Sequence, residues 1–388
     1  MTTTNIAPHA PLTIDELGAA ADARWHELDR ARRIPQDLHD AAASAGLFRQ
    51  LVAPALGGTG RPPVEWFRTG MALARHEASL AWVVTQGAAE LGWISAGADP
   101  EWAAEVLADP LGTSASTVAG LGRLAVDGDH ARFSGRWAFN TGSPNATWIG
   151  GIALVDGERR EGGSPVVRWG WVPADRATIA EDWDPIGMRG TGSHSTVVDD
   201  QEIPMAWTFN PYAPTDNDRG AHRCLVGNGN WPIATSIAAV QIGNARRALD
   251  EARTVVATKA PPPDFVRLAD SGAVQRQLVE AEGLWQAAVA VVERELDSMW
   301  AEATLLEELS PETRVALHRA NVTADRLATR AVELACELSG TAWISPGAVL
   351  GRCRRDALAL HGHVSVNGMS TEHNAKADLG TVVPSILV

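Results

Sequence analysis

The chain has 388 residues, of which 45% are hydrophobic and 21% are charged, and its formal net charge is −14 at pH 7. This length allows two or three domains, and the excess of acid repels nucleic acid and anionic membranes. No apolar run is long enough to span a bilayer, residues 1–10 lack the pattern of a secretory signal, and the three cysteines have no CxxC spacing. We therefore expect a cytoplasmic protein with neither a nucleic-acid nor a membrane partner.

Residues 1–110 have the pattern of a helical domain. Thr13 and Glu16 have the spacing of a capping box, and Pro35 starts a second helical pattern. The segment 65–96 is apolar and rich in alanine, so we expect one or two well-buried helices there.

Residues 111–225 have the pattern of a β domain. Short alternating or β-branched runs are bounded by Gly, Pro, Asn and Asp, at 132–139, 148–155, 166–172 and 195–198. Because no helices alternate with these runs, we expect an antiparallel sheet. The glycine-rich pieces at 57–60 and 120–122 do not connect a strand to a helix, so they do not predict a dinucleotide site.

Residues 226–388 are again helical. Long patterns cover 233–258, 273–306 and 311–339, and 352–363 belongs to a fourth helix. Long helices with short connections predict an antiparallel bundle. The predicted fold is therefore α+β: an N-terminal helical domain, a central antiparallel β domain and a C-terminal four-helix bundle.

A glycine- and hydroxyl-rich segment, 187–193, precedes a β-branched strand. It has the composition of a tight loop that offers backbone amides, hydroxyls and the arginine side chain to a ligand. Arg189 and Ser193 are its candidate binding residues, and a plain β-turn is the alternative.

A second segment is an aromatic strand that ends in Asn-Thr-Gly. Trp137 could flank a flat ring system with Phe139 beside it, and Asn140 or Thr141 could hydrogen-bond to the edge of that ring. The alternative is a core tryptophan followed by a turn.

The order of helices, sheet and bundle, together with these segments, resembles the acyl-CoA dehydrogenase superfamily over nearly the whole chain. The similar segments are 187–193 with the following 197–200, Arg354-Arg355-Asp356 in the last bundle helix, and 269–281 with Gln275. The resemblance implies a flavin between the β domain and the bundle, usually in a homotetramer. The residues that it implies for the cofactor are Trp137, Phe139, Asn140, Thr141, Arg189, Ser193 and Gln275.

The chain departs from the dehydrogenases of that superfamily at the catalytic base. Those enzymes resemble one another in carrying a glutamate shortly after the Arg-Asp pair. The equivalent position in this chain holds Val364, and residues 357–371 contain neither Asp nor Glu. Without this glutamate, the chain lacks the base that removes the α-proton of an acyl substrate in those enzymes. The Arg-x-x-Phe-Gly motif that helps to hold FAD is also missing near Lys259. An FAD-dependent acyl-CoA or acyl-carrier-protein dehydrogenase with its base elsewhere remains the second hypothesis, and a non-catalytic flavin-binding relative the third.

These departures resemble the two-component flavin-dependent monooxygenases, which are the oxygenase components of their systems. The resemblance implies reduced flavin, FMN or FAD, from a separate NAD(P)H:flavin reductase, and a flavin hydroperoxide formed with O2. A small aromatic, heteroaromatic, organosulfur or amino substrate would be oxygenated. This branch carries a histidine eight residues after the arginine of the Arg-Asp pair, here His363. His363 would lie beside the substrate and Thr141 near the reactive edge of the isoalloxazine.

Many members of this branch also carry a histidine after a Ser-x-x-Trp in an N-terminal helix. Ser79 and Trp82 are present, but the matching position holds Glu90. We expect Trp82 and Glu90 to contact the substrate, and the exchange argues against a simple phenol.

Histidines two residues apart point to different faces of a helix. We therefore prefer a structural role for His361, with a place beside the substrate as the alternative; a structural role is also the alternative for His363. A metal set of His361, His363, Glu372 and His373 is a weaker hypothesis, because alternate positions suit a strand. Asp356 is expected to form a structural ion pair with Arg354 or Arg355.

Overall fold

A computed structural model describes residues 11–213, 220–225, 228, 230–263, 265–306 and 308–381. Its N-terminal helices are α1 (Ile14–Ala23), α2 (Trp25–Ala31), α3 (Gln36–Ser44), α4 (Pro63–His76), α5 (Ala78–Gly97) and α6 (Pro100–Ala108). The predicted capping box begins α1, since the Thr13 hydroxyl accepts the Glu16 N–H and the Glu16 carboxylate accepts the Thr13 N–H.

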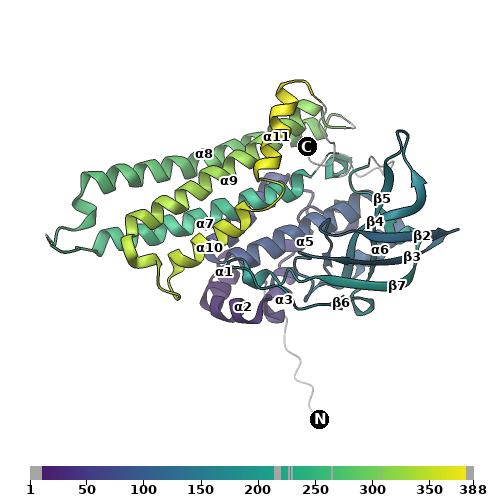
Figure 1. The fold of residues 1–388 in the computed structure, drawn as a ribbon, viewed down its shortest axis with the longest axis horizontal. Coiled ribbons are helices and arrows are strands. Elements are labelled where there is room, and N and C mark those ends of the chain that lie inside the picture. Colours follow the sequence, from purple (N-terminus) through teal and green to yellow (C-terminus); the bar gives the residue numbers. More distant parts are fainter. Residues whose placement is uncertain are drawn as a thin grey trace, which may run out of the picture.

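Helix α5 lies at the centre of the molecule, between the bundle and the sheet (Figure 1). Every residue from Ala78 to Ala96 is buried. A helix that is apolar on all sides is stable only inside a core, so α5 is enclosed by the other parts of the fold. Its N-terminus is capped by the Glu77 carboxylate, which accepts the Leu80 N–H at 2.6 Å.

The strands form one sheet in the order β6-β7-β3-β2-β4-β5-β8, with β1 paired to β4. They are β1 (Ser114–Ala115), β2 (Gly122–Asp127), β3 (His130–Trp137), β4 (Trp148–Arg159), β5 (Pro165–Pro173), β6 (Thr178–Ile179), β7 (Thr196–Pro204) and β8 (Thr208–Phe209). The prediction of a purely antiparallel sheet was wrong, because β1 and β2 both pair with β4 in parallel. Strand β4 starts at the end of the sheet where β3 finishes. Because β3 is antiparallel to β2, β4 runs in the same direction as β2, with which it pairs.

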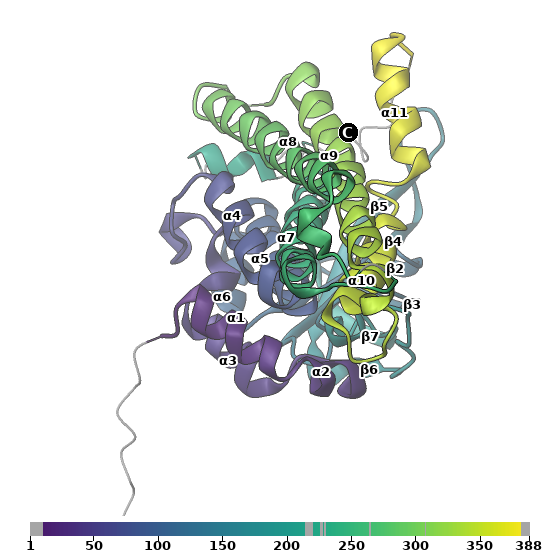
Figure 2. The same ribbon diagram turned by 90° about the vertical axis from the view of Figure 1, so that its left-hand side faces the viewer.

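The C-terminal helices are α7 (Trp231–Thr258), α8 (Gly272–Ala303), α9 (Pro311–Ser339), α10 (Val349–His361) and α11 (Gly368–Asp378). Helices α7 to α10 form the expected bundle, seen nearly end-on in Figure 2. The Ser310 hydroxyl caps α9, and Gly340 ends it at a φ of 57°, which favours glycine. The last bundle helix ends at His361, so His363 lies in the following turn and not in the helix. In the described ranges, no helix is long and apolar enough to cross a membrane.

Asp356 connects α10 to the loop at 187–193. Its carboxylate accepts the backbone N–H of Met188 at 2.6 Å, while the Arg354 guanidinium lies over the ring of Trp343. The predicted ion pair of Asp356 with Arg354 or Arg355 was therefore wrong: the buried carboxylate serves a backbone donor instead. Arg352 of the same helix does form an ion pair, with Asp22 at 2.8 Å.

Candidate active site

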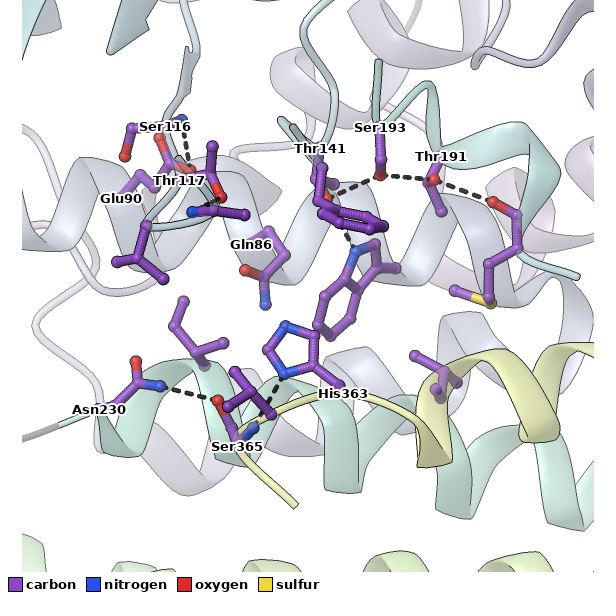
Figure 3. A pocket seen from close by; sticks show the side chains of 18 of the residues that line it. Gln86, Glu90, Ser116, Thr117, Thr141, Thr191, Ser193, Asn230, His363 and Ser365 are labelled. Atoms are coloured by element: carbon purple, nitrogen blue, oxygen red, sulfur yellow. Dashed lines mark hydrogen bonds between the residues drawn. The ribbon is translucent and has the colours of Figure 1, made fainter. Parts of the chain in front are cut away.

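A cavity of about 440 Å³ lies where α5, the sheet and the end of α10 meet (Figure 3). Its walls come from one face of α5, from 116–119, from the loop at 188–193, from the start of α7 and from 359–365. Cavities of this size and largely apolar lining bind small molecules. All three parts of the fold therefore contribute to one site.

His363 faces this cavity. Its Nδ1 atom accepts the backbone N–H of Ser365 at 3.2 Å, and its ring stands edge-on to Trp82 with centroids 5.8 Å apart. Burial disfavours the charged imidazolium and lowers the pKa of His363 to about 4. The ring is then neutral at neutral pH. Because Nδ1 accepts a hydrogen bond, the single ring proton lies on Nε2, which can donate into the cavity.

Thr141 belongs to a chain of hydrogen bonds along the opposite wall (Figure 3). The Trp82 indole N–H donates to the Thr141 hydroxyl at 3.0 Å, Thr141 contacts Ser193 at 2.9 Å, and Ser193 contacts Thr191 at 2.7 Å. The Thr191 hydroxyl donates to the carbonyl of Met188. Each hydroxyl has one proton, so the chain runs in one direction: Ser193 donates to Thr191 and Thr141 donates to Ser193. Thr141 can therefore only accept from a ligand.

Aromatic side chains line the outer part of the cavity. Phe139 is 61% exposed and has a φ of 57°, a conformation that bulky residues rarely adopt. Its ring stands edge-on to Trp183 with centroids 5.8 Å apart, and both side chains line the cavity. A strained backbone that displays an aromatic ring is characteristic of a binding site.

Glu90 lies in the wall formed by α5 and residues 116–119. One carboxylate oxygen, Oε1, accepts the Ser116 N–H at 2.9 Å. Burial raises the pKa of Glu90 to about 8. This side chain therefore carries its proton at neutral pH and is no base there.

Comparison with known proteins finds relatives over nearly the whole chain. The profile of the family described as "Acyl-CoA dehydrogenase, C-terminal domain" matches residues 235–368. The indole-3-acetate monooxygenase of Pseudomonas putida is 28% identical over 93% of this chain and 90% of that protein. The crystal structure of the 3-HSA hydroxylase from Rhodococcus sp. RHA1 has a TM-score of 0.86 at 23% identity, covering 97% of this chain and 98% of that one.

The chain thus resembles the C-terminal domain of acyl-CoA dehydrogenases over residues 235–368, and a monooxygenase over nearly its whole length. The chain is also similar to the FADH(2)-dependent resorcinol hydroxylase, oxygenase component, of Rhizobium sp. (strain MTP-10005). That protein is 27% identical over 93% of this chain and 91% of its own length. The predicted fold class is thereby confirmed, apart from the parallel pairings in the sheet.

The outer part of the cavity fits a flavin. The bare faces of Phe139 and Trp183 offer flat apolar contact to a ring system. Thr141 and Ser193 lie on the same wall, and Thr141 has a free acceptor position for a ring N–H. Reduced flavin carries such a proton on a central ring nitrogen that oxidised flavin lacks.

Four other residues predicted to bind the cofactor do not line the cavity within one chain. Trp137 is fully buried in the sheet, where its indole donates to the carbonyl of Ile152. Asn140 is buried behind the Thr141 turn, Arg189 pairs with Asp184, and Gln275 is exposed at the start of α8.

His361 also lies outside the cavity. Its Nδ1 atom pairs with the buried carboxylate of Asp325 at 2.6 Å, so the residue connects α10 with α9. The structure thus favours the structural role over a place beside the substrate.

The pair of His361 and Asp325 predicts a dependence of stability on pH. The hydrogen bond to Asp325 raises the pKa of His361 above 6.5. The stabilisation is complete below the unfolded pKa and is lost as the pH rises through the folded pKa. We expect His361→Gln to lower the melting temperature at about pH 6 and to have a smaller effect at about pH 9. An equal effect at both pH values would contradict this assignment.

A second prediction concerns the hydroxyl of Thr141. Thr141→Val leaves the Trp82 N–H without its acceptor, so we expect a loss of about 1–3 kcal/mol of stability. Thr141→Ser keeps the hydroxyl and should retain most of that stability. Thermal melting of both variants measures the difference; equal melting temperatures would show that the chain of hydroxyls contributes nothing.

The sequence reasoning missed several cavity residues on α5 and beyond. They are Gln86, Trp93, Trp169, Trp183, Thr191, Tyr212 and Asn230. A usable signal was present in α5, because positions 82, 86, 90 and 93 recur at helical spacing and carry polar or indole groups inside an apolar helix. The other residues come from separate elements, and their meeting depends on the tertiary fold.

Proposed function

We propose that this protein is the oxygenase component of a flavin-dependent monooxygenase, which uses reduced flavin and O2 to oxygenate a small aromatic, heteroaromatic, organosulfur or amino substrate. The decisive observation is the absence of a usable carboxylate base. Among the residues that the structure describes, Glu90 is the one acid that lines the cavity, and it holds a proton at neutral pH. Val364 lines the cavity beside His363, where the resemblance places the dehydrogenase glutamate.

Bound reduced flavin would supply the electrons that activate O2. Phe139, Thr141, Trp183 and Ser193 are the residues of this chain that would hold it. The apolar walls exclude water, which limits wasteful side reactions and strengthens hydrogen bonds inside the cavity.

His363 serves this chemistry as a hydrogen-bond donor. Its Nε2 proton points into the cavity because Nδ1 is occupied by the Ser365 N–H. A donor there stabilises negative charge that develops on oxygen, without an ionised imidazole. A role as base at Nε2 would require the other tautomer, which the Ser365 N–H disfavours.

We also propose a separate NAD(P)H:flavin reductase as partner, either FMN or FAD as cofactor, and a homotetramer. The name of the Rhizobium relative, an oxygenase component, supports the first. The exposed start of α8, with Gln275, and the exposed Val279 support a contact with a second copy. The three buried free cysteines support a cytoplasmic location.

The proposal is tested by supplying reduced FMN or FAD from an unrelated flavin reductase under 18O2, with a panel of aromatic compounds. We expect one 18O atom in the product. Tightly bound FAD in the isolated protein that is reduced by an acyl thioester would instead establish the dehydrogenase alternative. Absence of any product that depends on reduced flavin across the panel would favour a non-catalytic relative.

A further inference from the structure

The inner part of the cavity contains polar atoms without protein partners. Gln86 Nε2, Glu90 Oε2, Trp93 Nε1 and Asn230 Oδ1 are all buried and have no partner at normal hydrogen-bond distance, although the Ser114 and Ser116 hydroxyls lie near the Glu90 carboxylate and, against the larger effect of burial, act to lower its pKa. The four side chains are 4–9% exposed and all line the same cavity. Buried polar groups are nearly always paired, so this concentration indicates groups that are reserved for a ligand.

The spacing on α5 orders these groups along the cavity. Trp82, Gln86, Glu90 and Trp93 share one face of the helix. At about 1.5 Å per residue, Gln86 lies about 6 Å and Glu90 about 12 Å along the axis from Trp82. Trp82 is hydrogen-bonded to Thr141 on the side proposed for the flavin, whereas Glu90 is hydrogen-bonded to Ser116 at the opposite end (Figure 3). A ring beside Gln86 and His363 would direct its remote substituent to Glu90.

The lack of charged side chains in the cavity restricts the charge that this substituent can carry. Among the described residues that line it, there is no lysine or arginine. Glu90 and His363 are neutral at neutral pH, since burial raises the pKa of the first and lowers that of the second. An ion without a partner is costly to bury. The unpartnered atoms comprise donors, at Gln86 and Trp93, and an acceptor, at Asn230; a neutral carboxyl at Glu90 can be either.

We propose that the substrate is an uncharged aromatic compound whose remote end carries a group that both donates and accepts hydrogen bonds, such as a carboxamide. Glu90 and Gln86 are its specificity-determining residues. This inference rests on the proposed function, because it assigns the substrate of that site. It separates this chain from its Pseudomonas relative, whose name specifies an acetate.

The test is a binding measurement at pH 7 with three indoles of similar size: indole-3-acetamide, indole-3-acetate and tryptamine. Titration calorimetry on the flavin-free protein, with no flavin or O2 added, gives the three affinities. We expect the neutral amide to bind at least about tenfold more tightly than the anion or the cation, because only the amide is buried without an ionic penalty. Binding of either charged indole as tightly as the amide, or no binding of the amide, overturns the proposal.

Variants assign the effect to the side chains. Glu90→Gln keeps a neutral donor and acceptor, so it should hold the amide within about threefold of the wild-type affinity. Glu90→Leu should lose about tenfold or more for the amide but not for 3-ethylindole. Glu105→Leu, at an exposed position of α6, is the control. If Glu90→Leu fails to fold, Gln86→Leu carries the same expectation. Unchanged amide binding in the folded leucine variant overturns the assignment.

These measurements are independent of turnover. Selective amide binding without any oxygenated product would reject the proposed function and retain a site for neutral aromatic amides. Oxygenation of charged compounds with no preference for the amide would reject the substrate class and retain the monooxygenase.

Discussion

Replacement of His363 by alanine is expected to lower the rate of substrate oxygenation at least about 100-fold, the usual contribution of a positioned proton donor or acceptor. The imidazole presents its Nε2 proton to the cavity, and no other histidine lines it in the described part of the chain. The affinity for reduced flavin should change little, because the hydroxyls of Thr141 and Ser193 lie on the opposite wall. Product formation and hydrogen peroxide release, measured with excess reduced flavin, separate lost oxygenation from lost binding.

Two other histidines provide controls for this experiment. His130 is half-exposed on β3 and pairs only with exposed Asp129, so His130→Ala should leave turnover unchanged. His361→Gln changes a residue outside the cavity and should affect stability more than turnover. Turnover by His363→Ala at the wild-type rate would remove His363 from the mechanism and leave it a structural role.

Substitution of Gly187 by alanine is expected to destabilise the protein by about 1–3 kcal/mol and to weaken reduced-flavin binding. A Cβ atom there would lie 2.2 Å from the carbonyl oxygen of Arg355, and backbone cannot turn aside as a side chain can. The loop must then move away from α10, which stretches the bond between Met188 and Asp356. The same loop supplies Thr191 and Ser193 to the cavity wall, so the binding site is displaced too.

Gly347→Ala is the matched control, because nothing lies within 4 Å of its added Cβ atom and its φ is ordinary. Thermal melting and titration with reduced flavin should leave this variant close to the wild type. A Gly187→Ala protein with the wild-type melting temperature would show that the loop and α10 are not held together as closely as the contact indicates.

The parts of the fold that local sequence signals determine were predicted well. The helical pattern predicted for 311–339 coincides with α9, and the predicted capping box of Thr13 begins α1. The parallel pairing of β2 with β4 was not predictable in this way. A strand that follows β3 pairs in parallel with β2 but antiparallel with β3, so the outcome depends on which of the two strands it joins, and no residue in either strand encodes that choice locally.

In the candidate site, too, some residues could be predicted from the sequence and others could not. His363, Thr141, Trp82 and Glu90 were assigned from the family resemblance and do line one cavity. Trp137 was interpreted as a cofactor wall, but Gly122, Gly135 and Gly151 leave room for its indole inside the sheet. Those glycines come from three strands, so the space that they create exists only after the strands pair.

The burial of α5 on every side has a consequence for how this enzyme could acquire new substrates. The helix that we propose to contact the substrate is also the central support of the fold, so a change of volume at Gln86 or Glu90 would disturb packing as well as the cavity. The neighbouring segment 116–119, which also lines the cavity, is only partly buried. Evolution or engineering toward a new substrate should therefore proceed first through that loop, where variation is tolerated, and should reach α5 only after stabilising changes elsewhere.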